Sequence, residues 1–129
     1  MFELREHFSF TGNHKDLLGN PLGYTRTTTR QKWNPKYRDY QEYKNWVVQQ
    51  YWLQHGRSSV EKPFKDKLRG LVIIDIEFAS ERHADPDNVG KAILDALFEQ
   101  DKEIDLHVNH TCQNPESRTQ VLIYILNKE

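Results

Sequence analysis

The sequence predicts an α+β protein built from one mixed β-sheet of about four strands packed with two main helices. Apolar residues alternate with polar ones in four short stretches, which is typical of strands with one buried face. Two further stretches repeat apolar residues at helical spacing, and each begins with a proline that follows Asn or Asp. The chain has 129 residues, so we expect residues 1–129 to form a single domain.

The first half of the chain predicts one strand, one long loop and one helix. Residues 2–10 alternate in the manner of a strand. Residues 11–35 are rich in Gly, Asn, Pro and Thr and carry basic residues, so we expect a long basic loop that is functional or mobile. Residues 36–55 predict a helix that ends at Gly56. The core stripe of this helix is Tyr40, Tyr43, Val47, Val48 and Tyr51.

The second half predicts a strand, a helix and two final strands. Residues 71–79 form the strand, with Asp75 and Glu77 on the face opposite its apolar residues. The helix begins at Asp85-Pro86 and runs to about Phe98. Its core stripe is Val89, Ile93, Ala96 and Leu97. Residues 104–111 and 119–126 are the last strands, and a polar connection at 57–70 joins the two halves.

Composition and charge narrow the class of protein. No apolar run approaches the roughly 20 residues of a membrane helix, and the first residues do not resemble a signal segment, so we expect a cytoplasmic protein without membrane contact. Cys112 is the only cysteine, which excludes an internal disulfide. Residues 1–70 hold 13 of the 18 basic residues but only 7 of the 19 acidic ones. A basic half joined to an acidic half indicates either nucleic-acid binding or no more than chance and a solvated surface, and charge alone does not decide between them.

Ionisable residues concentrate at the start of the second helix. Asp85 and Asp87 flank a proline where free backbone N–H groups and the helix dipole favour negative charge. Asp87, Lys91 and Asp95 then follow at every fourth position on one helix face. One interpretation is a helix cap followed by a surface ladder of ion pairs. The other is a site for Mg²⁺, with Mn²⁺ as a substitute, because paired aspartates bind such ions and a lysine can neutralise a substrate phosphate.

A zinc site is a weaker interpretation. His107, His110 and Cys112 lie close together in the sequence, and His83 lies elsewhere. The first three do not all share one face of a strand, and the chain has no cysteine pair. We therefore expect these residues to have ordinary partners.

The run from Asp85 to Leu97, DPDNVGKAILDAL, closely resembles the signature of the RusA-type Holliday junction resolvases. That signature has Asp-x-Asp-Asn, a lysine four residues after the second Asp, and Asp-Ala-Leu four residues later. Looser similarity covers most of residues 24–126, and only this motif is diagnostic. The resemblance implies a homodimeric, Mg²⁺-dependent endonuclease that cuts branched DNA such as four-way junctions. Such enzymes act in recombination and repair and are often encoded by phages.

The resemblance also implies roles for single residues. Asp85 and Asp87 would be catalytic metal ligands, Lys91 would be the catalytic lysine, and Asn88 would orient the site and contact DNA. The third carboxylate of the family lies just beyond the helix, where this sequence departs from the family pattern.

Asp105 and Asp101 are the two candidates for that third carboxylate. A helix from 87 to 98 spans about 16 Å. The chain can return about 10 Å by Asp101 and about 23 Å by Asp105. We therefore expect Asp105 to be the third metal ligand, with Asp101 as the alternate.

Basic and aromatic residues alternate between Leu22 and Arg38, without any acid. Cations neutralise phosphates, and aromatic rings can stack on unpaired bases. The predicted DNA-binding residues are Arg26, Arg30, Lys32, Lys36 and Arg38. The alternative is a solvated loop that its aromatic residues anchor to the core. A second basic run is either a contact to DNA or a plain linker, and consists of Lys62, Lys65, Lys67 and Arg69.

These patterns together predict a structure-specific DNA endonuclease. The alternative is a non-catalytic protein of the same fold that binds branched DNA and has lost a carboxylate. Leu94 and Phe98 fall on the charged side of the second helix, at about 100° per residue. Either another part of the chain covers them or a second subunit does, and we expect the second subunit.

Overall fold

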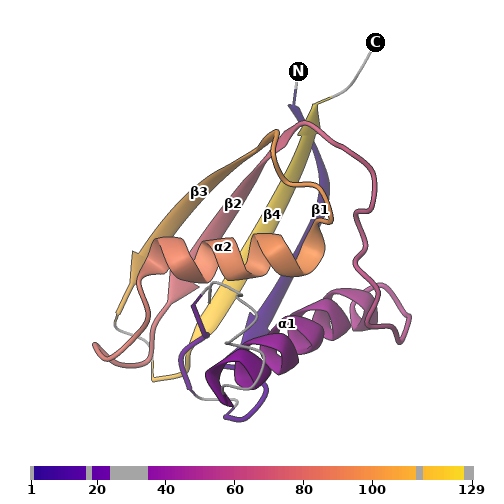
Figure 1. Cartoon of the computed structure of the whole chain (residues 1–129). Coiled ribbons are helices and arrows are strands. Elements are labelled where there is room, and N and C mark those ends of the chain that lie inside the picture. Colours follow the sequence, from indigo (N-terminus) through magenta and orange to yellow (C-terminus); the bar gives the residue numbers. More distant parts are fainter. Residues whose placement is uncertain (1, 17–18, 24–34, 113–114, 127–129) are drawn as a thin grey trace.

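The computed structural model describes residues 2–16, 19–23, 35–112 and 115–126 (Figure 1). Strands and helices follow in the order β–α–β–α–β–β, as the sequence predicts. Their bounds are β1 Phe2–Thr11, α1 Pro35–Leu53, β2 Gly70–Glu77, α2 Pro86–Leu97, β3 Ile104–Thr111 and β4 Arg118–Leu126. The expected α+β class, with one mixed four-stranded sheet and two helices, is therefore confirmed.

The sheet has the strand order β1-β4-β2-β3. β4 is antiparallel to both β1 and β2, whereas β3 is parallel to β2. The register pairs Gly70 with Ile104 and Glu77 with Thr111. The last residues of β2 and β3 therefore lie side by side. Because α2 connects two parallel strands, it must run back along them, and its two ends lie toward opposite ends of these strands.

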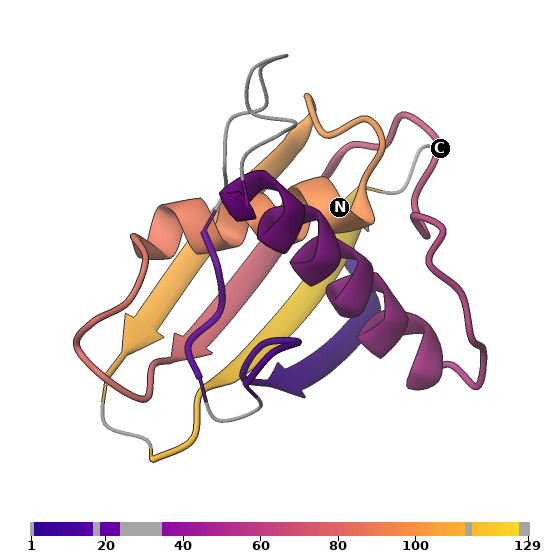
Figure 2. The same ribbon diagram turned by 60° about the horizontal axis from the view of Figure 1, so that its bottom comes forward.

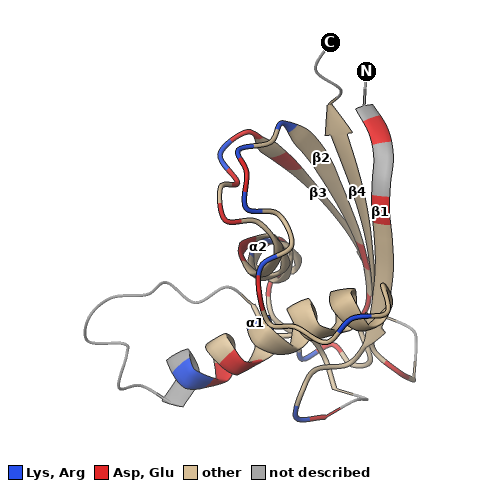
Figure 3. Cartoon of the chain, turned by 90° about the vertical axis from the view of Figure 1, so that its right-hand side faces the viewer, with Lys and Arg blue, Asp and Glu red and all other residues tan. Residues whose placement is uncertain are grey.

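Both helices cover one face of the sheet, and the other face carries no helix within the described residues (Figure 3). We call the uncovered face the open face. α1 contacts β1, and α2 contacts β2 and β3 (Figure 2). The core lies between the helices and the sheet. It contains all the apolar residues that the sequence assigns to the stripes of the two helices and to the apolar face of β2.

Gly90 lies against the β3 side chains Leu106 and Val108, with no room for a Cβ atom. A Cβ atom at this position would lie 2.6 Å from Cγ2 of Val108 and 3.1 Å from Cδ2 of Leu106. Such distances are too short for carbon atoms in contact. Glycine therefore fixes the height of α2 above β3, despite its low helix propensity.

The end of α1 also follows the sequence prediction. Gly56 has a φ of 76°. The N–H of Gly56 donates to the carbonyl of Leu53 at 3.1 Å, and the N–H of Arg57 donates to that of Trp52 at 2.8 Å. This pair of bonds is a Schellman motif, and the left-handed residue within it favours glycine.

The prediction that a second subunit covers Leu94 and Phe98 is wrong, because the chain itself buries them. Leu94 is 7% exposed and Phe98 is 1% exposed. The Phe98 ring stacks on Phe64 of the 57–70 connection, with centroids 4.7 Å apart. The backbone of Phe64 also bonds to both Leu97 and Glu99. α2 is packed on more than one side, because it contacts the sheet, α1 and the 57–70 connection.

Candidate active site

Asp85 caps the N-terminus of α2. Its Oδ1 accepts the N–H of Asp87 at 2.9 Å, and its carbonyl accepts the N–H of Val89 at 3.0 Å. Pro86 occupies the first helical position, where the missing N–H costs nothing. The capping part of the structural interpretation is therefore confirmed. The cap occupies one carboxylate oxygen, so the second oxygen of Asp85 can bind another group.

Asp87, Asn88 and Lys91 form an exposed strip along the first turns of α2. Neither Asp87 nor Lys91 makes an ion pair with any other residue that the structure describes. An anion that approached this end of α2 would therefore meet an unpaired lysine beside two carboxylates.

The ion-pair ladder predicted along this helix is wrong at Asp95. This carboxylate turns toward α1, where Lys44 Nζ lies 2.8 Å from Oδ2 and the hydroxyl of Tyr40 donates to the same oxygen at 3.0 Å. Lys62 lies 4.0 Å from the other oxygen. Burial opposes ionisation of Asp95, but the hydrogen bond and charge of Lys44 outweigh it and lower its pKa. Asp95 therefore joins the two helices.

We expect Asp95→Asn to lower the free energy of unfolding by about 1–2 kcal/mol at pH 7, because it leaves the mostly buried Lys44 without its anion. A lowered carboxyl pKa contributes stability above the unfolded value of about 3.9, and this contribution is lost as pH falls through the folded value. The difference between the variant and the wild type should thus shrink below about pH 4 in urea titrations. Asp39→Asn is the matched control, because its partner Lys15 is exposed, and it should cost under about 0.5 kcal/mol. Equal losses in the two variants would contradict this role for Asp95.

The structure does not bring Asp105 or Asp101 to Asp85 and Asp87 within one chain. Asp105 is the second residue of β3, pairs with Leu71 and is exposed on the open face. Asp101 precedes β3, and its carbonyl accepts the N–H of Ile104. Both follow the C-terminal end of α2, whereas Asp85 lies at its N-terminal end, about 18 Å away along the axis.

The chain does not return along α2 before Asp105, because β3 pairs with β2 as soon as the turn after α2 is complete and Asp105 is the second residue of β3. Pairing with β2 therefore fixes Asp105 at the N-terminal end of β3. Among the described residues, no group of three or more His, Cys, Asp or Glu side chains is placed to hold a metal ion.

His83, which precedes α2, and His110 of β3 lie near each other. The His83 ring stacks on Phe78 with centroids 3.7 Å apart, and the His110 ring lies 6.3 Å from it. Nδ1 of His83 lies 2.7 Å from the carbonyl oxygen of Ala84. The Nδ1–H therefore donates to this carbonyl, which leaves Nε2 of a neutral ring as an acceptor.

The predicted DNA-binding residues are only partly described. Arg26, Arg30 and Lys32 lie outside the described residues, as does the side chain of Lys36. Arg38 is exposed on the first turn of α1. The second basic run is paired with acids: Lys62 with Asp95, Lys65 with Glu61, and Lys67 and Arg69 with Glu103. These ion pairs favour the linker interpretation for this run.

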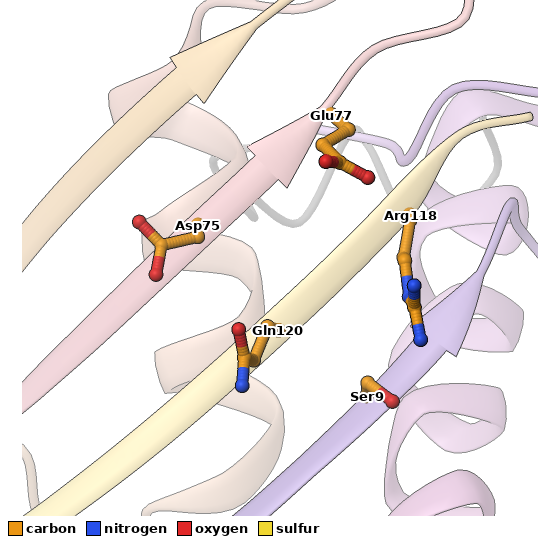
Figure 4. A pocket seen from close by; sticks show the side chains of 5 residues that line it. All are labelled: Ser9, Asp75, Glu77, Arg118 and Gln120. Atoms are coloured by element: carbon orange, nitrogen blue, oxygen red, sulfur yellow. The ribbon is translucent and has the colours of Figure 1, made fainter. Parts of the chain in front are cut away.

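A polar pocket on the open face has no counterpart in the sequence analysis. It has a volume of about 230 Å³ and is lined by Ser9, Asp75, Glu77, Arg118 and Gln120 (Figure 4). The amide of Asn109 donates to Oδ1 of Asp75 at 2.9 Å. The alternation of β2 does place Asp75 and Glu77 on one face, as predicted. Their neighbours come from β1 and β4, and only the strand order reveals those.

Comparisons with known proteins do not assign the chain to a family. No protein-family model matches it, and no curated protein sequence matches it. Within the described residues, no helix is both long and apolar enough to cross a membrane. The fold and the site define a class: an α+β protein in which a helix begins at the end of two parallel strands and carries two acids and a lysine at its start.

Proposed function

We propose that the chain is a Mg²⁺-dependent endonuclease of the RusA type that hydrolyses phosphodiester bonds in branched DNA. One observation carries the proposal. Asp85, Asp87 and Lys91 are exposed together on the first turns of α2, and Lys91 has no ion-pair partner among the described residues. A helix cap explains Asp85, but neither a cap nor an ion-pair ladder explains the other two.

The donor set fits Mg²⁺, which commonly binds one or two carboxylates and completes its shell with water and substrate phosphate. When bound, the ion would supply Lewis acidity and an activated water for attack on the phosphodiester. Lys91 lies about 6 Å along the axis from Asp87, one turn away, and would hold a phosphate oxygen. The positive end of the α2 dipole also favours the phosphate. Asn88, between the two, would orient it by hydrogen bonding.

A synthetic four-way junction, incubated with and without Mg²⁺, tests the proposal. We expect paired nicks near the branch point that require the ion, and no cleavage of a linear duplex of the same sequence. Junction binding without cleavage in Mg²⁺ or Mn²⁺ would instead support the non-catalytic alternative. That alternative is favoured by one observation, the distance of Asp101 and Asp105 from the helix start.

A homodimer would reconcile the third carboxylate with the fold. β3 is an edge strand that pairs only with β2 among the described strands. Its C-terminal end adjoins the start of α2, and its N-terminal end carries Asp105. If the β3 edges of two subunits pair antiparallel, the start of β3 with Asp101 and Asp105 in one subunit lies beside the strand end that adjoins Asp85 and Asp87 in the other, with Asp105 itself on the open face. We therefore propose that each active site takes its third carboxylate from the second subunit.

Subunit mixing tests this arrangement. Asp87→Asn and Asp105→Asn homodimers should both be inactive. A heterodimer of the two variants concentrates both changes in one site and leaves the other site complete, so it should nick one strand of a junction at about half the wild-type rate. The same mixing experiment with Asp101→Asn in place of Asp105→Asn shows which of the two carboxylates is the third ligand, because only the variant of that residue should inactivate its homodimer. An inactive heterodimer would show that all three carboxylates act within one subunit.

The basic loop is expected to contact DNA. Replacing Arg26, Arg30 and Lys32 together with Ala should weaken junction binding and flatten its salt dependence by up to about 0.9 per lost phosphate contact. Replacing the ion-paired Lys65 and Lys67 is the matched control, because these cations already have acidic partners. A salt slope that stays at the wild-type value in the triple variant would exclude the loop from the DNA interface.

A further inference from the structure

A groove runs beside the start of α2, between residues 20–23 and residues 82–84. Its volume is about 410 Å³, which is in the range of small-ligand sites. Ala84 at one end of the groove immediately precedes Asp85. The groove therefore lies beside the candidate active site.

Asn20 joins the two segments that line the groove by hydrogen bonds. Its Oδ1 accepts the N–H of Ala79 at 2.7 Å, and its Nδ2 lies 3.1 Å from the carbonyl of Arg82 and 3.2 Å from Oγ of Ser80. At the other end, a Cβ on Gly23 would lie 3.0 Å from that of Ala84. These contacts join segments about 60 residues apart in sequence, so the groove is held open as a fixed shape.

The chemistry of the lining suits a nucleotide. Arg82 is exposed, makes no ion pair with any described residue, and is the one permanently charged residue of the lining. An unpaired guanidinium can bind phosphate oxygens in pairs. Leu22 supplies apolar surface, and the edge of the His83 ring, held flat against Phe78, adds a polar group.

We propose that this groove is a subsite for the DNA strand next to the cleaved bond, in which Arg82 binds the phosphate adjacent to the one at Asp85 and Asp87. The subsite rests on the proposed endonuclease function. Arg82 positions the strand, and it does not take part in the bond-breaking step. Nucleotides that the protein unstacks at the branch point would fit an open groove more readily than paired ones.

Binding measurements on a neutralised phosphate test the subsite. In the Asp87→Asn protein, which should bind without cleaving, we expect Arg82→Ala to weaken junction affinity about tenfold. The junction is then made with a single uncharged methylphosphonate at each linkage within three nucleotides of the branch point. At one linkage, the loss of binding free energy in the double change should be smaller than the sum of the losses from Arg82→Ala and from the methylphosphonate, because both remove the same contact. Additive effects at every linkage would overturn the subsite.

Arg118→Ala is the matched control, because it removes an equally exposed arginine from the open face on the far side of the sheet. It should leave junction affinity within about twofold and show no coupling at any linkage. Equal losses in the two arginine variants would also overturn the subsite. The two failures are distinguishable. If the proposed function is wrong, the wild type cuts no junction in Mg²⁺. If only the subsite is wrong, the wild type cuts the junction but Arg82 shows no coupling to any phosphate in the binding measurements.

Discussion

Asp85→Asn and Asp87→Asn are expected to abolish junction cleavage while the protein stays folded and binds DNA as tightly as the wild type or more tightly. Each change would remove a proposed metal ligand, whose ion would supply several kcal/mol of transition-state stabilisation, which corresponds to a loss of about 10²–10⁴-fold in rate. Each also removes a negative charge that faces the phosphate. Cleavage rates and junction affinity, measured on the same preparations, check both halves of the expectation.

Asparagine at position 85 separates catalysis from capping. Asn is about as good an N-cap as Asp, so Asp85→Asn should keep the bond to the N–H of Asp87 and change stability by under about 0.5 kcal/mol. Asp85→Ala should lose about 1 kcal/mol as well as cleavage. Asp66→Asn, an exposed acid of the connection, is the control and should cleave normally. Full cleavage by Asp85→Asn and Asp87→Asn would leave capping as the whole role of these residues.

The fold was predictable wherever one residue pattern decides one local structure. The alternation along β2 fixes which side chains face the helices, and Asp85-Pro86 marks the start of α2 because the capping oxygen and the missing proline N–H suit that place alone. The strand order was not predictable. Which edge β1 takes depends on packing between distant segments, and the register of β1 against β4 even shifts between Leu4 and Glu6.

The site was predictable in part, for the same reason. Asp85, Asp87 and Lys91 share a helix start, so helical spacing alone places them together. The position of Asp105 depends on where β3 begins to pair, and the distance a loop can reach says nothing about where it goes. Asn20 and Arg82 were not predictable as groove residues, because a groove between segments about 60 residues apart produces no local sequence pattern. An asparagine between Gly19 and Pro21 was the only hint of a fixed turn there.

Phe98→Glu is expected to unfold the protein rather than to yield a folded monomer. Phe98 is 1% exposed and stacked on Phe64, so even Phe98→Ala should cost about 3–5 kcal/mol, a large part of the 5–15 kcal/mol of a typical domain. A glutamate there would add the cost of burying an unpaired carboxylate. Circular dichroism and urea titration measure the loss, and Leu53→Glu, at a side chain that is 58% exposed, should change stability by under about 0.5 kcal/mol. A folded, monomeric Phe98→Glu protein from a dimeric wild type would return this helix face to the subunit interface, and the antiparallel pairing of β3 edges proposed above would then be wrong.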